Sequence, residues 1–191
     1  IAHTQSHMSV SLDNYMAGTL AAEHFLSLGH KNIACIMGPL SVWISRERTR
    51  GFKECLYQNN IELRDRLLVE GDFRFESGYE VAKQIFSAAA PADRPTAVWA
   101  QSDLMAAGVL KYLYTIGLRV PQDVSIIGMD NIGIAKMLTP SLTTIAQPFR
   151  QIARESVQLL LHADAAERPA PSITLSPSLV ERESTGPAAR K

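Results

Sequence analysis

Short apolar runs alternate along the chain with longer segments whose apolar residues recur every three to four positions. Such short runs, rich in β-branched residues, predict strands, and their lack of alternation is typical of strands covered on both faces. Each strand run is followed by a helical segment, which predicts βαβ units and a parallel, doubly wound α/β sheet. The four runs are Ile33–Met37, Leu67–Glu70, Thr96–Ala100 and Val124–Ile127.

Capping residues mark where the predicted helices begin and end. Gly29 and Gly117 suit the left-handed position that closes a helix. Ser, Asp and Asn favour the position before a helix because their side chains accept hydrogen bonds from its first amides. The expected helix starts are, in chain order, Asp13 or Asn14, Ser45, Ser77 and Ser102.

The stretch from Gly117 to Asn131 contains a helix stop, a turn, an apolar strand and a carboxylate. Gly128 is expected to let the chain leave the sheet, which leaves Asp130 just beyond the strand's carboxyl end. That edge of an open parallel sheet is where ligands bind. Asp130 is therefore a candidate ligand contact, although it could equally cap the short helix expected after it.

The pattern is less regular after Asp130. A short helix is expected over residues 132–137, a strand over Leu142–Ile145 and an amphipathic helix over Phe149–Leu161. Two short strands follow, over 173–175 and 179–183, and the proline between them favours edge positions.

Composition limits the protein's class. At 191 residues the chain suits one domain, or one and a fraction, with 46% hydrophobic and 20% charged residues. No apolar run approaches the length of a membrane span. The formal net charge is zero, which argues against a nucleic-acid surface on this chain. Cys35 and Cys55 are expected to be buried reduced thiols, which favours a cytoplasmic protein.

Polar and aromatic side chains follow each of the four strands, and parallel strands bring these exits to one edge. Such residues are suited to a small polyhydroxylated ligand. Carboxylates accept hydrogen bonds from its hydroxyls, the planar arginine side chain donates to them, and an aromatic ring covers its apolar face. The candidate residues along that edge are Ser41, Trp43, Arg46, Arg48, Asp72, Phe73, Ser102, Asp103 and Asp130.

Each candidate also has a purely structural interpretation. Arg46 and Arg48 could be solvated surface charges, and Phe73 could belong to the core. Asp103 could be a first-turn carboxylate favoured by the helix dipole. Only the expected convergence of these residues favours a ligand site.

Enzyme signatures are missing from the sequence. It has no glycine-rich dinucleotide loop, no Walker loop and no nucleophile elbow. No Cys/His cluster has metal-ligand spacing, and the five histidines fall away from the expected ligand edge. We therefore expect no catalytic residue, no metal and no cofactor, and a binding protein in place of an enzyme.

Several motifs resemble one protein family in order along residues 10–185. They include Val10-Ser-Leu-Asp-Asn14, Arg48 with Gly51-Phe52, Pro95-Thr-Ala-Val-Trp-Ala-Gln-Ser-Asp103 and Thr139-Pro-Ser-Leu-Thr-Thr-Ile145. These segments, with Gly117–Asn131, resemble the effector-binding core of the lactose/galactose repressor (LacI/GalR) family of bacterial transcription regulators.

The resemblance implies a type I periplasmic-binding-protein-like fold, in which an effector lies between two α/β subdomains. Position by position, Arg48 and Asp130 resemble the residues that bind sugar hydroxyls, and Phe73 resembles the aromatic residue against the ligand ring. Ser102 falls where sugar-binding members often carry asparagine. Val42 and Ile44 replace polar base-reading residues, so the resemblance favours a carbohydrate over a purine.

The same resemblance implies that this chain is mostly the C-terminal subdomain. Residues 1–12 would end the N-terminal subdomain or form a cut tail, and residues 13–144 would be the C-terminal effector-binding subdomain. Residues 145–171 would form a crossover helix segment of the N-terminal subdomain, and 172–191 the return strands and a flexible tail. The N-terminal DNA-binding headpiece would be absent.

The resemblance also implies a homodimer, formed in this family through the helices expected here over 77–89 and 104–116. The apolar residues available for this interface are Met105, Val109, Tyr112 and Leu113. The resulting hypothesis is the effector-binding and dimerising part of a cytoplasmic sugar-responsive repressor, in which subdomain closure alters operator affinity. Operator DNA would be bound only through the headpiece, and no membrane is involved. The alternatives are a periplasmic sugar-binding protein of a transport system and, less favoured, a sugar-metabolising enzyme.

Overall fold

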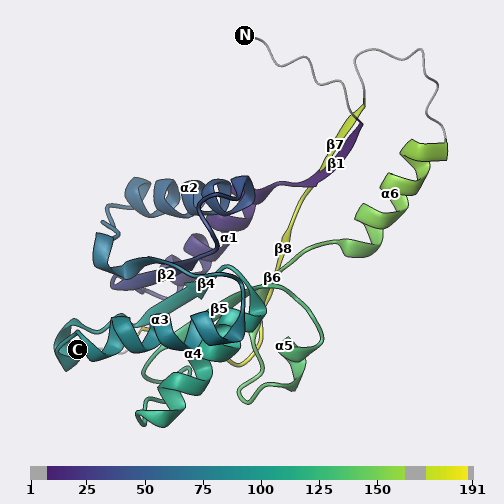
Figure 1. Ribbon diagram of the computed structural model, residues 1–191. Coiled ribbons are helices and arrows are strands. Elements are labelled where there is room, and N and C mark those ends of the chain that lie inside the picture. The colour runs from purple at the N-terminus through teal and green to yellow at the C-terminus, as the bar shows by residue number, and fades with distance from the viewer. Residues whose placement is uncertain (1–7, 162–170, 189–191) are drawn as a thin grey trace.

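A six-stranded sheet forms the centre of the protein in the computed structural model, which describes residues 8–161 and 171–188 (Figure 1). Five of its strands are parallel, and the sixth, β8, pairs antiparallel with β6 at the edge. In spatial order the strands are β3 (Leu68–Glu70), β2 (Ile33–Met37), β4 (Ala97–Ala100), β5 (Ser125–Asp130), β6 (Thr143–Ala146) and β8 (Ser178–Val180).

Helices cover both faces of this sheet. One apolar cluster joins α1 (Asn14–Ser27) and α2 (Trp43–Gln58) to the sheet, and the other joins α3 (Phe75–Ser87) and α4 (Asp103–Thr115) to it. Trp99 and Phe52 stack within the first cluster with ring centroids 4.8 Å apart. Burial on both faces explains the continuous apolar strands and confirms the predicted doubly wound α/β class.

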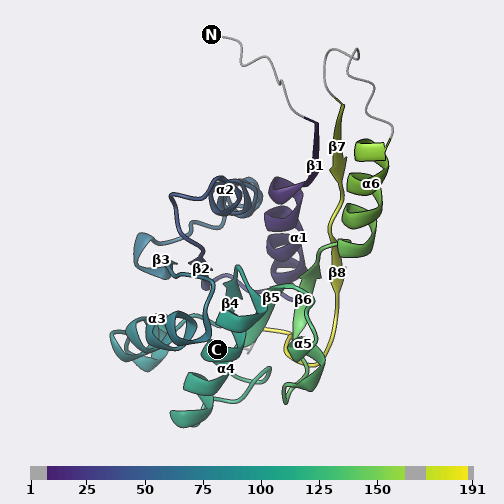
Figure 2. The same cartoon turned by 45° about the vertical axis from the view of Figure 1, so that its right-hand side comes forward.

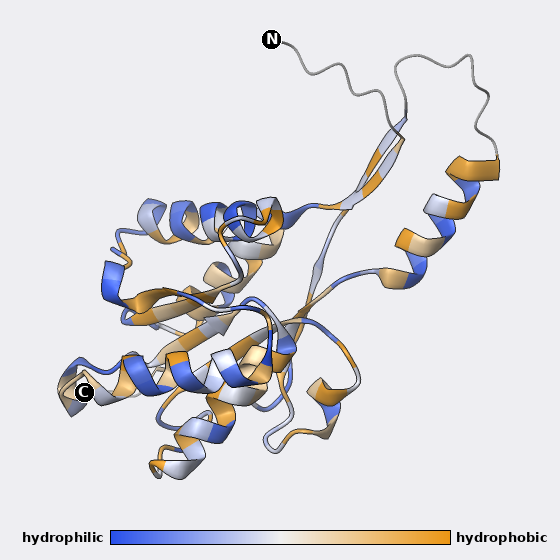
Figure 3. Ribbon diagram, viewed as in Figure 1, coloured by the Kyte–Doolittle hydropathy of each residue, from blue (hydrophilic) through white to orange (hydrophobic). Residues whose placement is uncertain are grey.

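A second unit projects from the sheet, and Figures 1 and 2 show it at one end of the molecule. It consists of β1 (Ser9–Leu12), which pairs parallel with β7 (Ser172–Leu175), and of α6 (Phe149–Leu161), which packs along β1. We call β1, β7 and α6 the arm, and the six-stranded sheet with its helices the body. No described residue of α6 is buried, and four of its apolar residues, Phe149, Val157, Leu160 and Leu161, are exposed (Figure 3).

Three shorter elements complete the structure: the 3-10 turns Asp65–Leu67 and Pro91–Asp93, and α5 (Ile134–Met137). Gly117 has a φ of 73°, and the amide of Leu118 donates to the carbonyl of Leu113 across it. This is the helix closure that the sequence predicted. Asp13 and Ser102 cap α1 and α4, also as predicted.

The predicted start of a helix near Ser45 is confirmed, whereas the helix cap predicted at Ser77 is wrong. The helices α2 and α3 begin two residues before Ser45 and Ser77, and the cap position of α3 is Arg74. The Ser77 hydroxyl instead donates to the carbonyl of Arg74 and accepts from the amide of Asp72, so it fixes the turn before the helix. Ser77 therefore lies inside α3, and no side chain caps the first amides of this helix.

Gly128 does not release the chain from the sheet as predicted, because β5 continues through it to Asp130. A Cβ atom at this position would lie 2.3 Å from Oδ1 of Asp103 and 2.8 Å from the Leu142 side chain. Glycine is required there by the close approach of another segment, and not by a change of chain direction.

The apolar residues expected at a dimer interface lie in the core. Met105, Val109, Tyr112 and Leu113 are all buried between α4, α3 and the sheet. The exposed apolar side chains on these two helices are different ones, at Phe75, Leu104 and Tyr114, with Ile116 at the end of α4.

Two histidines, His24 and His30, lie at the edge of the sheet opposite the strand exits. The other three, His3, His7 and His162, lie outside the described residues. His30 contacts the hydroxyls of Thr96 and Ser125 and the carbonyl of Gly186, and His24 contacts the hydroxyl of Thr185. They fasten the C-terminal segment to the base of the sheet, away from the ligand edge. Cys35 and Cys55 are buried and free, as predicted.

Candidate functional site

The strand order reverses between β2 and β4, because the connection after β3 crosses back over β2. In open parallel sheets, ligands bind outside the carboxyl ends of the strands at such a point. Gly38, just after β2, donates its amide to Oε1 of Gln101, just after β4, at 3.1 Å. This contact joins the exits of β2 and β4 at the candidate site.

Arg48 is buried in this site, with only 3% of its surface exposed. Its Nε donates to Oδ1 of Asn14 at 2.9 Å, and its Nη1 donates to the carbonyl of Gln101 at 3.2 Å. Burial lowers the pKa of the guanidinium, and the charge of Asp130 opposes that shift. The surface interpretation of Arg48 is therefore wrong, whereas Arg46 is exposed.

Asp130 is the last residue of β5 and lies at the same edge as Arg48. Burial raises the pKa of its carboxyl, while a hydrogen bond from Gln147 and the charge of Arg48 lower it. The Nε2 of Gln147 donates to Oδ1 of Asp130 at 2.6 Å. The cap position of α5 is Gly133, so Asp130 does not cap that helix.

The turn after β5 has an unfavourable backbone conformation. Asp130 has a φ of 109° and Asn131 one of 57°, a region that L-residues seldom adopt. The amide of Asn131 donates to the hydroxyl of Thr144 at 3.3 Å, and Arg182 donates to Oδ1 of Asn131 at 2.6 Å. Contacts from two other segments thus hold the turn that presents the Asp130 carboxylate.

Asp103 supports the same turn from below. Its carboxylate is buried and accepts from the hydroxyl of Thr144 at 2.6 Å and from the amide of Ile132 at 2.8 Å. Desolvation by burial raises the pKa of Asp103 to about 6, against the lowering effect of these hydrogen bonds. Its oxygens are used within the protein, so the structural interpretation of Asp103 fits better than a ligand contact.

Ser102 and Phe73 lie side by side at the strand-exit edge. The Ser102 hydroxyl donates to the carbonyl of Phe73 at 2.9 Å and accepts from the amide of Met105 at 3.1 Å. The Phe73 ring packs over Gly38, where it occupies the space of a side chain. Phe73 is half-buried, whereas Ser102 is buried with its hydroxyl engaged in these two bonds. Contact of either residue with a ligand stays a prediction.

Three amide side chains of the site were not predicted: Asn14, Gln101 and Gln147. Gln101 is fully buried and also donates from Nε2 to the hydroxyl of Thr49 at 2.9 Å. Gln101 and Gln147 each directly follow a strand, so the rule that selected Asp130 could have included them. The sequence gives no comparable indication that Asn14 belongs to the site, because only the folded chain brings α1 next to α2.

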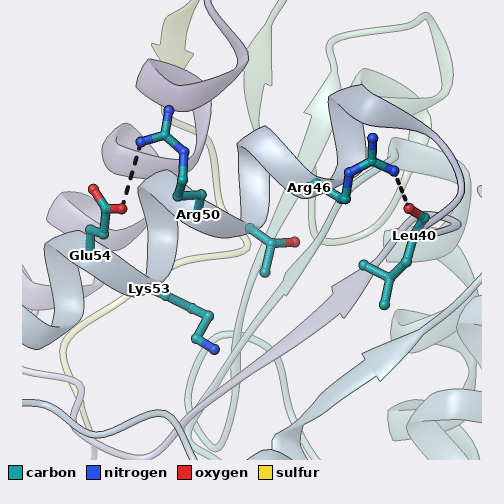
Figure 4. A pocket seen from close by; sticks show the side chains of 6 residues that line it. Leu40, Arg46, Arg50, Lys53 and Glu54 are labelled. Atoms are coloured by element: carbon teal, nitrogen blue, oxygen red, sulfur yellow. Dashed lines mark hydrogen bonds and ion pairs between the residues drawn. The ribbon is translucent and has the colours of Figure 1, made fainter.

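Apolar side chains lie at the start of α2, close in sequence to Arg48. Val42 and Trp43 are exposed, with 54% of the Trp43 surface accessible. A shallow pocket lies further along the same helix, lined by Leu40, Arg46, Thr49, Arg50, Lys53 and Glu54. Figure 4 shows Arg46 donating to the carbonyl of Leu40 and Arg50 paired with Glu54. This pocket lacks Arg48 and Asp130 and is separate from the strand-exit site.

Two further features, a metal centre and a membrane span, are missing from residues 8–161 and 171–188. Within these ranges no cluster of three or more His, Cys, Asp or Glu side chains could hold a metal ion. The helices of the same ranges are all too short or too polar to cross a bilayer.

Residues 22–185 match the family model of a periplasmic binding protein-like domain. The chain is 41% identical over 175 residues to the HTH-type transcriptional repressor PurR of Serratia proteamaculans. It is 37% identical over 179 residues to the HTH-type transcriptional regulator DegA of Bacillus subtilis. These alignments cover 91% and 93% of the chain but 50% and 52% of the relatives. The chain thus spans about half the length of the curated relatives it matches.

Solved structures of similar proteins share the fold. A transcriptional regulator CelR–cellobiose complex has a TM-score of 0.87 at 32% identity, covering 94% of this chain and 54% of that one. The lac repressor dimer bound to operator and an anti-inducer has a TM-score of 0.86 at 32% identity, covering 93% of this chain and 60% of that one.

Proposed function

Because the chain belongs to the periplasmic-binding-protein-like effector cores of the lactose/galactose repressor family, we propose that it binds the effector of a bacterial transcription repressor. The observation that carries this proposal is the buried Arg48, whose charge interacts with that of the half-buried Asp130, at the point where the strand order reverses. Removing a charge such as that of Arg48 from water is costly unless a charged partner or a ligand compensates for the lost hydration. A ligand with several hydroxyls would donate to the carboxylate and accept from the guanidinium.

The proposed effector is a small carbohydrate. Asp130 accepts and Arg48 donates, while the half-buried Phe73 and the exposed Trp43 offer apolar surface to the faces of a sugar ring. A structure neighbour, the CelR regulator, is described as a cellobiose complex, which supports this ligand class. Ser102 would support the site by capping α4 and by donating to the carbonyl of Phe73.

The whole protein would act by population shift. An effector that favours one arrangement of two subdomains would alter operator affinity through a DNA-binding headpiece. Operator binding requires the protein to work in the cytoplasm. The exposed arm of β1, β7 and α6 would pack within a second subdomain, and two copies would pair through the exposed face of α3 and α4.

The transport alternative, a periplasmic sugar-binding protein, is less well supported. The relatives at 37% to 41% identity are regulators of transcription, and so are the structure neighbours with TM-scores of 0.86 and 0.87. An enzyme is disfavoured because regulators are not catalysts and the sequence lacks a catalytic constellation.

A thermal-shift screen of the chain against pentoses, hexoses, cellobiose, sugar acids and purines tests the proposal, with calorimetry on each compound that raises Tm. The expected result is saturable binding of one sugar, weakened by roughly tenfold or more in Asp130→Asn and unchanged in the surface variant Gln151→Met. Binding of a purine alone would overturn the carbohydrate class. No saturable binding of any compound would overturn the effector role of this site.

A further inference from the structure

The candidate ligand carboxylate is tied to the arm through a single residue, Gln147. Its side-chain Nε2 donates to Oδ1 of Asp130 at 2.6 Å. Its backbone carbonyl accepts from the amide of Phe149, the first residue of α6, at 2.9 Å. Two consecutive hydrogen bonds therefore lead from the carboxylate to the base of the arm's helix.

Gln147 lies where the chain leaves the body. Asp130 is opposite Ala146 in the β5–β6 pairing, so Gln147 is the first residue beyond the sheet on that side. Pro148 follows, and its carbonyl accepts from the amide of Ile152 in the first turn of α6. The rigid end of β6 and the start of α6 are thus separated by two residues.

The other charge of the site has a similar tether. Arg48 donates to Oδ1 of Asn14, the first residue of α1. The Nδ2 of Asn14 donates in turn to the carbonyl of Leu12, the last residue of the arm strand β1. The buried Arg48 and the half-buried Asp130 are therefore each bonded to an amide side chain at a crossing between body and arm.

We infer that Gln147 is a positioning residue that makes the occupancy of Asp130 and the placement of the arm interdependent. This inference rests on the proposed function, since it assigns the regulation of the same site. A ligand hydroxyl that donates to Asp130 meets a carboxylate already held by Gln147. Any shift of that carboxylate changes the Gln147 bond and with it the base of α6, and by linkage the arm position changes ligand affinity equally.

Charge and burial support the tether. Asp130 is partly desolvated, and the hydrogen bond from Gln147 favours its ionised form. A bond to an ionised acceptor is stronger than one between neutral groups, particularly at a desolvated site. The tether is therefore strongest when Asp130 carries the charge that a ligand hydroxyl requires.

The first test needs no ligand. In Gln147→Met, which keeps the side-chain length but removes the donor, amide hydrogen exchange in the first turn of α6 should rise about tenfold, the factor expected for losing a charge-assisted hydrogen bond. Gln147→Lys restores a donor and should restore protection. Gln151→Met, on the exposed surface of α6, should match the wild type.

The second readout separates positioning from general stability. The pKa of Asp130, followed by carboxyl carbon NMR, should rise in Gln147→Met and stay at or below the wild-type value in Gln147→Lys. In a double-mutant cycle, Gln147→Met should raise amide hydrogen exchange in the first turn of α6 only slightly when Asp130→Asn has already removed the charge. Additive effects, or an unchanged Asp130 pKa, would overturn the inference.

A third measurement keeps the two proposals distinguishable. With cellobiose as the probe, arm position is read from spin labels at Tyr57→Cys and Val157→Cys, both exposed while the native cysteines are buried. The expected result is a distance change on binding in the wild type that is lost in Gln147→Met although cellobiose still binds. The same change in both proteins would overturn the inference. If the wild type binds no sugar, the proposed function fails and the ligand-free cycle still decides the role of Gln147.

Discussion

The hydroxyl of Thr144 donates a 2.6 Å hydrogen bond to Oδ1 of Asp103, which joins β6 to the first turn of α4 beneath the ligand edge. The other oxygen of Asp103 holds the amide of Ile132, two residues after Asp130. One buried carboxylate therefore organises three segments around the candidate site. Its removal should affect both stability and the turn that presents Asp130.

Asp103→Asn should change how stability depends on pH. The folded pKa of Asp103 is raised from 3.8 to about 6, so its contribution is fully present below pH 3.8 and is lost as pH rises through 6. At about 1.4 kcal/mol per unit, this contribution is on the order of 3 kcal/mol. The free energy of unfolding, measured with urea at pH 4, 5, 6 and 7, should therefore change less with pH in the variant than in the wild type.

A matched control is available for this titration. The hydrogen bonds from Arg119 lower the pKa of the more exposed Asp123 to about 2. Between pH 4 and 7 the free energy of unfolding of Asp123→Asn should therefore depend on pH in the same way as that of the wild type. A parallel curve for Asp103→Asn as well would contradict the role of burial at that position.

Replacing the two site charges should have unequal effects on stability. Asp130→Asn keeps a residue that tolerates positive φ and should weaken sugar binding by roughly tenfold or more, with a small change in Tm. Arg48→Met should abolish binding and also lower stability by about 1–3 kcal/mol, because Asn14 and Gln101 lose their donor. Calorimetry and urea unfolding measure the two effects; equal losses of stability would contradict this difference.

Gly128→Ala should destabilise the protein by about 1–3 kcal/mol, since the new methyl group would overlap Asp103 and Leu142. Gly133→Ala is the matched control, because a Cβ there meets no atom within 4 Å. Urea unfolding of both variants checks the prediction. Equal stability of the two would show that the β5–α4 contact can relax.

His30→Gln should reduce the sensitivity of the fold to mild acid. Burial lowers the pKa of His30, a hydrogen bond to the carbonyl of Gly186 raises it, and the charge of His24 lowers it further. The stability that neutral His30 contributes is present above pH 6.5 and is lost as pH falls through its lower folded pKa. The wild type should therefore lose more stability than the variant between pH 7 and pH 5 in urea unfolding.

Tyr114→Glu should weaken a homodimer, because Tyr114 is 78% exposed in the last turn of α4, where the exposed Ile116 follows. A buried charge at such an interface is costly unless it is paired. Sedimentation velocity should show monomer for this variant and dimer for the wild type. Tyr57→Glu, equally exposed on α2, should stay dimeric; dissociation in both variants would exclude α4 as the specific interface.

Much of the fold followed from local pattern. The strands β2 to β6 and the helices between them lie within a few residues of their predicted positions, and α6 has the predicted bounds. The convergence of Arg48, Phe73, Ser102 and Asp130 at one edge follows from parallel strand order alone, since every strand of a parallel sheet ends on the same side.

The sequence by itself determined which elements form and which residues stand at their exits, because hydrophobic period and capping chemistry act over a few neighbouring residues. Only the tertiary structure decided that Arg48 is buried against Asn14, and that Asp103 and Gly128 fit together. It also decided that Gln147 joins Asp130 to the arm. Each of these depends on segments far apart in the chain, and their approach is fixed by packing that no local pattern encodes.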